Sequence, residues 1–292
     1  MKRCREYFKL TKPGIIYGNA LTLVAGFMLA SHNAQTTLEQ VEFILLLATL
    51  IGLSLVIAAG CVFNNYFDRD IDALMERTRK RALVTGVISP KNALIFGYAL
   101  FTLGVLILYF FTNTLAFILS LVGFFVYVFW YTMALKRHST HSTLLGGIAG
   151  AMPPVVGYVS VLGAIDAGAV LLFLLLTIWQ MPHSFGIALY RLSDYKKANV
   201  PVLPLRKGIL ATKIQIGVYI FLFLIIATSF YFFKLAHEVY IVIISLLSLW
   251  WLALSLKGFR LKEGEEKMWA KSIFKFSIII LSVFCFLLIL GL

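Results

Sequence analysis

The sequence has little charge and little cysteine. Only 13% of its 292 residues are charged, whereas 61% are hydrophobic, and the mean hydropathy is +0.92. A soluble globular protein carries about 25% charged residues, so this chain has too few to cover a surface in water. The three cysteines, Cys4, Cys61 and Cys285, form no C-x-x-C pair, which excludes a disulfide framework and a zinc ribbon. The composition predicts an integral membrane protein.

Long hydrophobic runs make up most of the chain. A membrane helix needs about 20 apolar residues to cross a hydrocarbon core of roughly 30 Å, and 292 residues leave room for about nine such helices. The expected fold class is an all-α, polytopic bundle that forms a single membrane domain over residues 1–292. We predict spans at about 14–31, 43–63, 92–111, 114–134, 144–163, 167–187, 213–233, 239–256 and 272–291.

The net charge of +13 lies almost entirely on one side of this predicted bundle. All 26 Lys and Arg residues except Lys234 fall before the first span or after the second, fourth, sixth and eighth spans. Because Lys and Arg accumulate on the cytoplasmic side, we predict a cytoplasmic N-terminus. We also expect the first span to be retained rather than removed as a secretory signal. Without it, the basic segments would no longer all fall on one side of the membrane. The basic composition is thus a topology signal and does not indicate nucleic-acid binding.

Acidic residues gather on the same basic side. Asn64, Asp68 and Asp72 follow the second span at intervals of four residues, with no Pro or Gly among them. A helix that continues through this segment places the three side chains on one face and Asp70 on another. Such hard oxygen ligands suit Mg²⁺, which binds through one or two carboxylates plus substrate phosphates. The alternative interpretation is a solvated, charged helix end.

A second polar segment follows the sixth span and repeats the spacing of the first. Asp72 precedes Gly86 by 14 residues, and Asp194 precedes Gly208 by 14 residues. We interpret this as a weak internal duplication, in which two half-bundles each deliver a polar loop to the same mouth. The second loop has one carboxylate and extra lysines, which favours binding of anionic oxygens over a second complete metal site.

Together these features predict a substrate with a diphosphate head and a hydrocarbon tail. A metal and nearby cations would stabilise a departing diphosphate. An allylic diphosphate would leave a carbocation, which needs a dry pocket with aromatic faces. Tyr127, Phe129, Trp130 and Tyr131 lie near the predicted cytoplasmic face, where they either line such a pocket or form an interfacial aromatic belt. Gly146 and Gly150 with Pro153 and Pro154 predict close helix packing plus a break in that helix.

Several ordered motifs resemble the UbiA-type intramembrane prenyltransferases, and among these the protohaem farnesyltransferases. The first motif is Asn-x-x-x-Asp-x-x-x-Asp at 64–72, continued by the basic segment 76–86. The subgroup resemblance adds Thr11-Lys12-Pro13 with Asn19, segments 131–137, 146–157 and 179–183, and Asp194-Tyr195 with segment 198–204. Ala198 stands where relatives that prenylate aromatic acids carry a second acid, which agrees with the haem subgroup. The chain departs from the subgroup at Ala82, His138, Ser139 and His141.

The resemblance implies transfer of farnesyl from farnesyl diphosphate to a vinyl group of protohaem IX, which is a substrate and not a resident cofactor. Water then completes haem O, and diphosphate is released. Asn64, Asp68 and Asp72 would bind Mg²⁺ and diphosphate. The other implied site residues are Arg77, Arg81, Lys136 and Arg137 as diphosphate ligands, Asp194 and Lys197 in the second loop, and Tyr131, His183 and Asn19 at the substrates. The active-site loops are expected at about 64–91, 135–143 and 190–212.

The resemblance further implies a multi-pass protein of the bacterial inner membrane that supplies a downstream haem-modifying enzyme or terminal oxidase assembly. His183 follows Pro182 near the end of a span, where it either hydrogen-bonds a neighbouring segment at a proline break or contacts the haem. The alternative acceptors are a quinone precursor and a chlorin. A transporter or haem-handling protein is a further alternative, although the spans carry almost no charge near mid-membrane.

Overall fold

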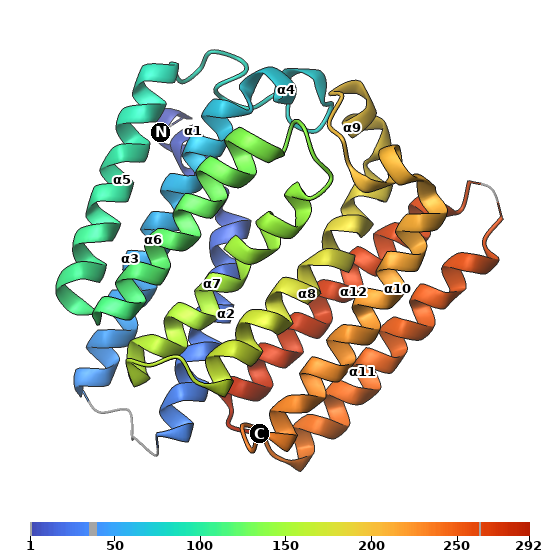
Figure 1. Ribbon diagram of the computed structural model, residues 1–292. Helices are drawn as coiled ribbons and strands as arrows, with labels where there is room; N and C mark the ends of the chain where they lie inside the picture. Colours follow the sequence, from blue (N-terminus) through green and yellow to red (C-terminus); the bar gives the residue numbers. More distant parts are fainter. Residues whose placement is uncertain (1, 35–39, 263) are drawn as a thin grey trace.

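The computed structural model describes residues 2–34, 40–262 and 264–292, in which helices are connected by turns (Figure 1). Four elements are short: α1 (Lys2–Leu10), α4 (Arg69–Leu74), α9 (Leu192–Lys197) and the 3₁₀ helix η2 (Gly258–Arg260). The long helices are α2 (Pro13–Asn33), α3 (Gln40–Phe67), α5 (Pro90–Phe111), α6 (Thr114–Phe125) with the π-helix η1 (Val126–Leu135), α7 (Ser142–Leu162), α8 (Ala167–Tyr190), α10 (Leu203–Phe232), α11 (Glu238–Lys257) and α12 (Glu266–Ile289).

Nine helical segments of the described residues are long and apolar enough to cross a membrane. They overlap the nine predicted spans one for one, which confirms the predicted fold class. Two predicted boundaries were wrong. The seventh segment begins at Leu203 rather than at 213, with a bend at Gly208, and the ninth begins at Glu266 rather than at 272. The first extra stretch contains Arg206 and Lys207, and the second contains Glu266, Lys267 and Lys271, so hydropathy excluded them although their backbone is helical.

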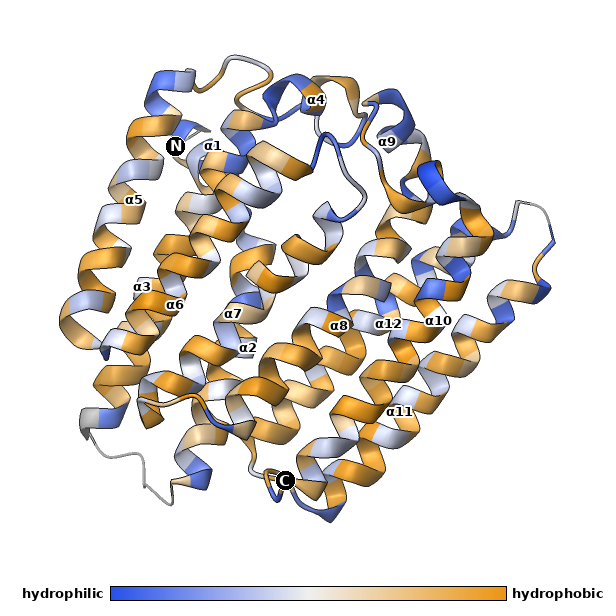
Figure 2. Ribbon diagram, viewed as in Figure 1, coloured by the Kyte–Doolittle hydropathy of each residue, from blue (hydrophilic) through white to orange (hydrophobic). Residues whose placement is uncertain are grey.

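The long helices consist mostly of hydrophobic residues along their length (Figure 2), and many of these residues are exposed on the outside of the bundle. Large side chains such as Phe110, Phe232 and Trp250 are 68%, 71% and 68% exposed. An apolar surface of this extent is unfavourable in water but matches lipid. Hydrophilic residues gather at the end of the bundle that carries α1, α4 and α9, so the polar loops predicted from the sequence lie together at one end.

The same order of long and short helices occurs twice along the chain. α2, α3, α5 and α6 with η1 form the first half, α7, α8, α10 and α11 form the second, and α12 follows. The short helices α4 and α9 each contain 6 residues and follow the second long helix of their half. Gly86 and Gly208 both have positive φ, 76° and 85°, a conformation that glycine adopts without steric cost. These correspondences agree with the duplication inferred from the spacing.

The two halves touch where α2 crosses α7. A Cβ atom on Gly26 would lie 2.0 Å from the carbonyl oxygen of Pro154, and one on Gly157 would lie 2.2 Å from that of Leu23. Only glycine permits this backbone-to-backbone contact. The close packing predicted at Gly146 and Gly150 is confirmed at other contacts of α7, because a Cβ on Gly150 would lie 1.7 Å from Nε2 of Gln180 on α8 and one on Gly146 would lie 3.3 Å from the Tyr131 ring. The predicted helix breaks are wrong, because α7 runs through Pro153 and Pro154 and α8 continues beyond Pro182.

Candidate active site

The predicted metal ligands lie at the end of α3. Contrary to the sequence prediction, this helix does not continue to Asp72, because Asp68 has φ −88° and ψ 1° and α4 begins after it. Helical hydrogen bonds nevertheless persist, from the Asp68 N–H to the Asn64 carbonyl (2.9 Å) and from the Asp72 N–H to the Asp68 carbonyl (2.8 Å). The three residues thus follow one another by one turn. All are buried, with 3%, 1% and 2% exposure for Asn64, Asp68 and Asp72.

Each of the two buried carboxylates has a cation partner. The Lys136 ammonium donates to Oδ2 of Asp68, and the Arg81 guanidinium donates to Oδ2 of Asp72 at 2.5 Å. The Thr78 hydroxyl also donates to the carbonyl of Asp72 (2.8 Å), which ties the first polar loop (residues 68–89) to the cluster. Pairing is required because an isolated buried carboxylate is strongly unfavourable. Two predicted diphosphate ligands, Lys136 and Arg81, therefore converge on the two carboxylates among the three predicted metal ligands.

Asn64 connects the carboxylates to α2 and η1. Its Oδ1 accepts a hydrogen bond from the Lys12 ammonium, and its Nδ2 donates to the Thr132 hydroxyl (2.9 Å). Lys12 lies immediately before α2 in the left-handed region (φ 52°). Its withdrawal from water disfavours the charged form and lowers the pKa of Lys12 to about 8. Neither Lys12 nor Thr132 is among the site residues predicted from the sequence. Lys12 nevertheless belongs to the Thr-Lys-Pro motif that begins the first span.

The π-helix η1, which the sequence did not predict, shapes one wall of the site. The Lys136 N–H donates to the Tyr131 carbonyl five residues earlier (3.0 Å), and this wider turn places the ammonium 5.9 Å from the Tyr131 ring centroid. The Tyr131 ring stacks on Tyr127, with centroids 5.6 Å apart. Phe129 and Trp130 are 40% and 55% exposed. The exposure of Phe129 and Trp130 agrees with an interfacial aromatic belt, whereas a pocket lined by the two stacked tyrosines stays a prediction.

The second polar loop (residues 191–202) contacts the first. Asp194 is 5% exposed and accepts a hydrogen bond from the backbone N–H of Glu76 (3.2 Å). An apolar cluster also joins α4 to the α9 segment (Figure 1). Its buried members are Ile71, Met75, Ala198 and Val200, with Tyr195 and Val202 packed against them. The prediction that both loops meet at one mouth of the bundle is thus confirmed.

The remaining predicted cations lie at the rim of this mouth. Arg137 donates to both carboxylate oxygens of Asp70 (2.6 and 2.7 Å) and to the carbonyl of Phe67 (2.6 Å). This bonding lowers the pKa of Asp70 to about 2 and raises the pKa of Arg137. The guanidinium therefore fixes the start of α4, a contact that the sequence did not indicate. Arg77 and Lys197 are exposed, and neither forms an ion pair within the described residues.

His183 and Asn19 lie apart from the carboxylate cluster. On α8, Nδ1 of His183 shares a hydrogen bond with the Ser277 hydroxyl of α12 (2.7 Å). Its ring lies between those of Trp179 and Phe274, at centroid distances of 4.7 and 5.0 Å. The hydrogen bond uses Nδ1 and leaves Nε2 for another ligand. Asn19 donates to a carbonyl one turn earlier on α2 (2.8 Å), and its contact with substrate stays a prediction.

The donor set of the cluster fits a hard divalent cation. Oδ1 of Asp68 is buried and has no hydrogen-bond partner in the described part of the chain, and a cation would satisfy this anionic oxygen. The described residues contain no group of three or more His, Cys, Asp or Glu side chains placed to hold a metal. Two carboxylates and one amide instead leave coordination positions for oxygens of water and phosphate, which is the usual pattern for Mg²⁺.

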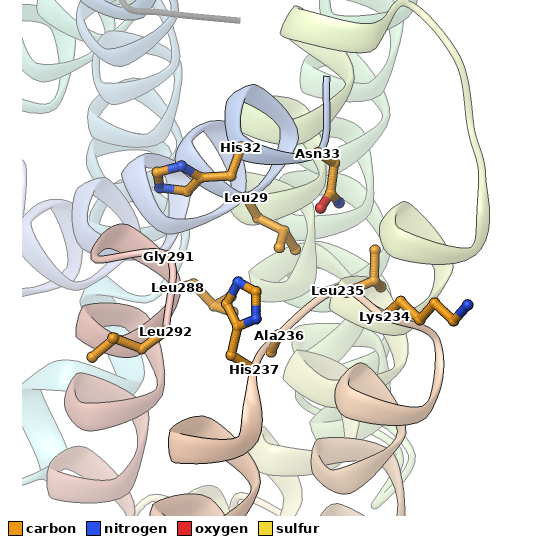
Figure 3. A pocket seen from close by; sticks show the side chains of 10 residues that line it. All are labelled: Leu29, His32, Asn33, Lys234, Leu235, Ala236, His237, Leu288, Gly291 and Leu292. Carbon is orange, nitrogen blue, oxygen red and sulfur yellow. The ribbon is translucent and has the colours of Figure 1, made fainter. Parts of the chain in front are cut away.

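Two cavities lie at opposite ends of the bundle. One of about 180 Å³ opens beside the carboxylates, and its lining includes Lys9, Asn65, Arg77 and Arg81. The other, of about 310 Å³, lies between the ends of α2 and α12 and the turn before α11, and is lined by His32, His237 and mostly apolar residues (Figure 3). No predicted site residue lines the larger cavity. The end with the carboxylates is therefore the candidate active site.

Comparison with known proteins identifies the family. The sequence model of the UbiA prenyltransferase family matches residues 19–287. The chain belongs to the UbiA prenyltransferase family. This family assignment confirms the resemblance drawn from the motifs, and it agrees with a multi-pass membrane protein built from nine candidate spans within the described residues.

Two relatives of this UbiA-family chain cover nearly its whole length. A protoheme IX farnesyltransferase of Yersinia pseudotuberculosis is 46% identical over 94% of this chain and 90% of the relative. A protoheme IX farnesyltransferase of Protochlamydia amoebophila is 47% identical over 95% of each chain. Both belong to the subgroup that the motifs resemble.

Solved structures share the fold of this UbiA-family chain at lower identity. A structure of digeranylgeranylglyceryl phosphate synthase covers 100% of this chain and 99% of its own, with a TM-score of 0.79 and 20% identity. A UbiA homolog from Archaeoglobus fulgidus bound to GPP and Mg²⁺ covers 97% of this chain and 99% of its own, with a TM-score of 0.63 and 19% identity. These matches extend the fold assignment over the entire bundle.

Proposed function

We propose that this UbiA-family enzyme transfers the farnesyl group of farnesyl diphosphate to a vinyl group of protohaem IX, giving haem O and diphosphate. Relatives named protoheme IX farnesyltransferase share 46% and 47% of its residues over almost its full length. The observation that carries the proposal is the buried cluster of Asn64, Asp68 and Asp72. It lies at one end of an apolar bundle, and cations pair with both carboxylates.

The cluster and its cations form the proposed diphosphate site. Mg²⁺ held by Asn64, Asp68 and Asp72 would supply positive charge that stabilises the departing diphosphate. Lys136 and Arg81 donate one hydrogen bond each to these carboxylates, and their other N–H groups are free to bind phosphate oxygens. Arg77 and Lys197 add positive charge from the rim, Arg137 holds the start of α4 through Asp70, and Asp194 holds the second loop against the first.

The hydrocarbon tail would extend into the apolar interior. When the allylic C–O bond breaks, its electron pair leaves with the diphosphate and a farnesyl cation remains. Tyr127 and Tyr131, stacked next to Lys136, present aromatic faces to such a cation, and the surrounding bundle excludes water. A bond then forms between the farnesyl carbon and the terminal vinyl carbon. Water adds to the resulting cation and loses a proton, which leaves the hydroxyethylfarnesyl group.

His183 is the proposed contact with the haem iron. Metal-binding histidines commonly have a second partner at the other ring nitrogen, which fixes the orientation of the ring. Ser277 provides this partner at Nδ1, and the flanking rings of Trp179 and Phe274 restrict the imidazole further. Nε2 would therefore be presented to the iron with little loss of side-chain freedom.

We place the enzyme in the inner membrane of a bacterial cell, with its N-terminus in the cytoplasm. The distribution of the 26 Lys and Arg residues, of which Lys234 alone falls on the opposite side, supports this orientation. Farnesyl diphosphate would then bind from the cytoplasmic face. A haem-modifying enzyme or terminal oxidase assembly in the same bilayer would receive the haem O.

Mass spectrometry of haem extracted from membranes tests the proposal. Membranes that contain the enzyme, supplied with farnesyl diphosphate and protohaem, should yield haem O, and membranes with Asp72→Asn should insert the protein normally but yield none. Prenylation of a quinone precursor or a chlorin, with no product from protohaem, would assign a different acceptor. Movement of farnesyl diphosphate across the membrane without any product would indicate a transporter.

A further inference from the structure

Three cations approach one aromatic ring where α8 meets α12. The guanidinium carbon of Arg191 lies 4.6 Å from the ring centroid of Tyr190. Nζ of Lys271 and Nζ of Lys267 lie 5.6 and 5.9 Å from the same centroid. We call these four residues the Tyr190 cluster. It belongs to the end of the bundle that carries the carboxylates, since α8 ends there and α12 begins there (Figure 1).

The positive charge of the Tyr190 cluster is not compensated by any carboxylate of the described residues. Glu266, the acid next to Lys267 in sequence, pairs with Lys213 instead (3.6 Å). A tyrosine ring attracts each cation through the negative face of its π-system. The cations repel one another over similar distances. A bound anion would offset this repulsion, so the cluster favours a negatively charged ligand.

The cavity beside the carboxylates is a weaker candidate for a second anion site. Two of its cations already have partners, because Lys9 pairs with Glu6 (2.6 Å) and Arg81 pairs with Asp72 (2.5 Å). The Tyr190 cluster differs in that none of its three cations pairs with a carboxylate of the residues that the structure describes. Of the two, it is therefore the better place for an anionic group that the diphosphate site does not bind.

The Tyr190 cluster and His183 lie along the same seam between α8 and α12. His183 and Tyr190 are seven residues apart on α8, which is about two turns or roughly 10 Å along the axis. Lys267, Lys271 and Phe274 follow the i, i+4, i+7 spacing of one face of α12, and Phe274 contacts the His183 ring. Between these positions Gly186 lets the helices approach closely. The seam thus has cations at its rim and an imidazole two turns deeper.

We propose that the Tyr190 cluster binds the propionate carboxylates of the protohaem acceptor. This assignment rests on the proposed function, because it requires a tetrapyrrole dicarboxylate as the second substrate. Arg191 offers parallel N–H donors that match a carboxylate, while Lys267 and Lys271 act as adjustable point charges. The diphosphate cations at the α3 end and the acceptor cations at the α8–α12 end then bind different substrates.

The test compares protohaem with its dimethyl ester, in which both propionates are neutral. The full-length enzyme in nanodiscs of neutral lipid should bind the ester at least about tenfold more weakly than protohaem, as measured by the change in haem absorbance. The Lys267→Gln/Lys271→Gln variant should bind the two ligands within about twofold of each other. The control is Lys257→Gln/Lys262→Gln, which removes two exposed lysines outside the cluster and should keep the wild-type ratio. Affinity for farnesyl diphosphate reports whether each variant is folded.

Three outcomes would overturn the assignment. The first is a cluster variant that keeps the wild-type ratio of ester to acid affinity. The second is equal binding of acid and ester by the wild-type enzyme. The third is a ratio that changes with the anionic lipid content of the nanodisc and not with the variant, which would identify a lipid site. Haem O formation separates these results from failure of the proposed function, because an enzyme that makes haem O with an unchanged ratio refutes only the Tyr190 assignment.

Discussion

The two polar loops share a backbone plan but bury different groups. Each contains a six-residue helix, α4 or α9, and each is followed by a glycine with positive φ, Gly86 at the end of the first loop and Gly208 within α10. The cluster at the first loop buries Asp68 and Asp72, and a cation pairs with each. The second loop buries Asp194, which accepts a hydrogen bond from a backbone N–H of the first loop, and has the apolar Ala198 four residues later. The shared backbone places both loops at one mouth, whereas the side chains decide which loop can hold a metal.

The largest expected difference is between Asp68→Asn and Asp194→Asn. Loss of a carboxylate that we propose to bind the metal should lower the rate of haem O formation by about 10³-fold or more, equivalent to about 4 kcal/mol of the barrier. Asn at position 194 still accepts the Glu76 N–H bond, so its rate should stay within about tenfold of wild type. The measurement is the initial rate in membranes with equal enzyme content. Equal losses in the two variants would mean that both loops bind the metal.

A smaller effect is expected when a cation of the first cluster is removed. Lys136→Gln leaves Asp68 without its ammonium partner and removes a donor to the diphosphate. Charge-assisted hydrogen bonds of about 1.5–3 kcal/mol correspond to a rate loss of roughly 10–100-fold. Steady-state kinetics with varied farnesyl diphosphate should show this loss in kcat/KM. Arg79→Gln is the control, because Arg79 is exposed and forms no ion pair in the described structure, and its kinetics should match wild type.

Restoring a second acid in the second loop should destabilise the protein. Ala198 is 5% exposed within the apolar cluster of Ile71, Met75 and Val200, one helical turn after Asp194. Ala198→Asp would bury a second carboxylate there, with an expected loss of about 1–3 kcal/mol, visible as a lower Tm in a thermal melt. Ala198→Asn separates the effect of charge from that of polarity. A Tm that Mg²⁺ raises in the Asp variant but not in the Asn variant would contradict the comparison, because the second loop would then hold a metal.

The smallest effect is expected at the Arg137–Asp70 pair, which lies outside both buried sites. Hydrogen bonding to Arg137 lowers the pKa of Asp70 from 3.8 to about 2, so the pair stabilises the folded state above about pH 4 and loses this contribution as pH falls toward 2. Asp70→Asn should leave activity within about twofold of wild type, because the Asp70 side chain is 60% exposed. The stability difference between the two proteins should shrink between pH 4 and pH 2. A difference independent of pH would show that the charge of Asp70 is not its source.

Local patterns of the sequence predicted most of the fold. Nine apolar runs predict the nine candidate spans found among the described residues, because each run is visible from its own residues alone. The prediction for α5 lies within two residues of its observed bounds, Pro90–Phe111. The start of α10 was missed because Arg206 and Lys207 lie inside its first two turns. The bend at Asp68 was missed for a different reason, since no Pro or Gly marks it and the loop contacts that hold it come from distant residues.

The candidate site was predicted where its residues are close in sequence. The four-residue spacing of Asn64, Asp68 and Asp72 is local, so it was visible without a structure. Lys136 and Asp68 are 68 positions apart, and Lys12 and Asn64 are 52 apart. These pairings depend on how α2, α3 and η1 pack, which the spacing does not encode. Arg137 is a further example of a pairing that the sequence did not predict. The family resemblance implies that Arg137 binds diphosphate, whereas in the structure its guanidinium pairs with Asp70.

The contact between α2 and α7 restricts how the bundle can open. Carbonyl oxygens of Pro154 and Leu23 occupy the positions where side chains of Gly26 and Gly157 would begin, so these helices have no lateral clearance and no side-chain layer that can rearrange. Separating them would open only this crossing, because α7 also packs against α6 and η1 of the first half. A farnesyl tail and a tetrapyrrole therefore have no entry between α2 and α7, and must reach the interior between other helices or past the polar loops.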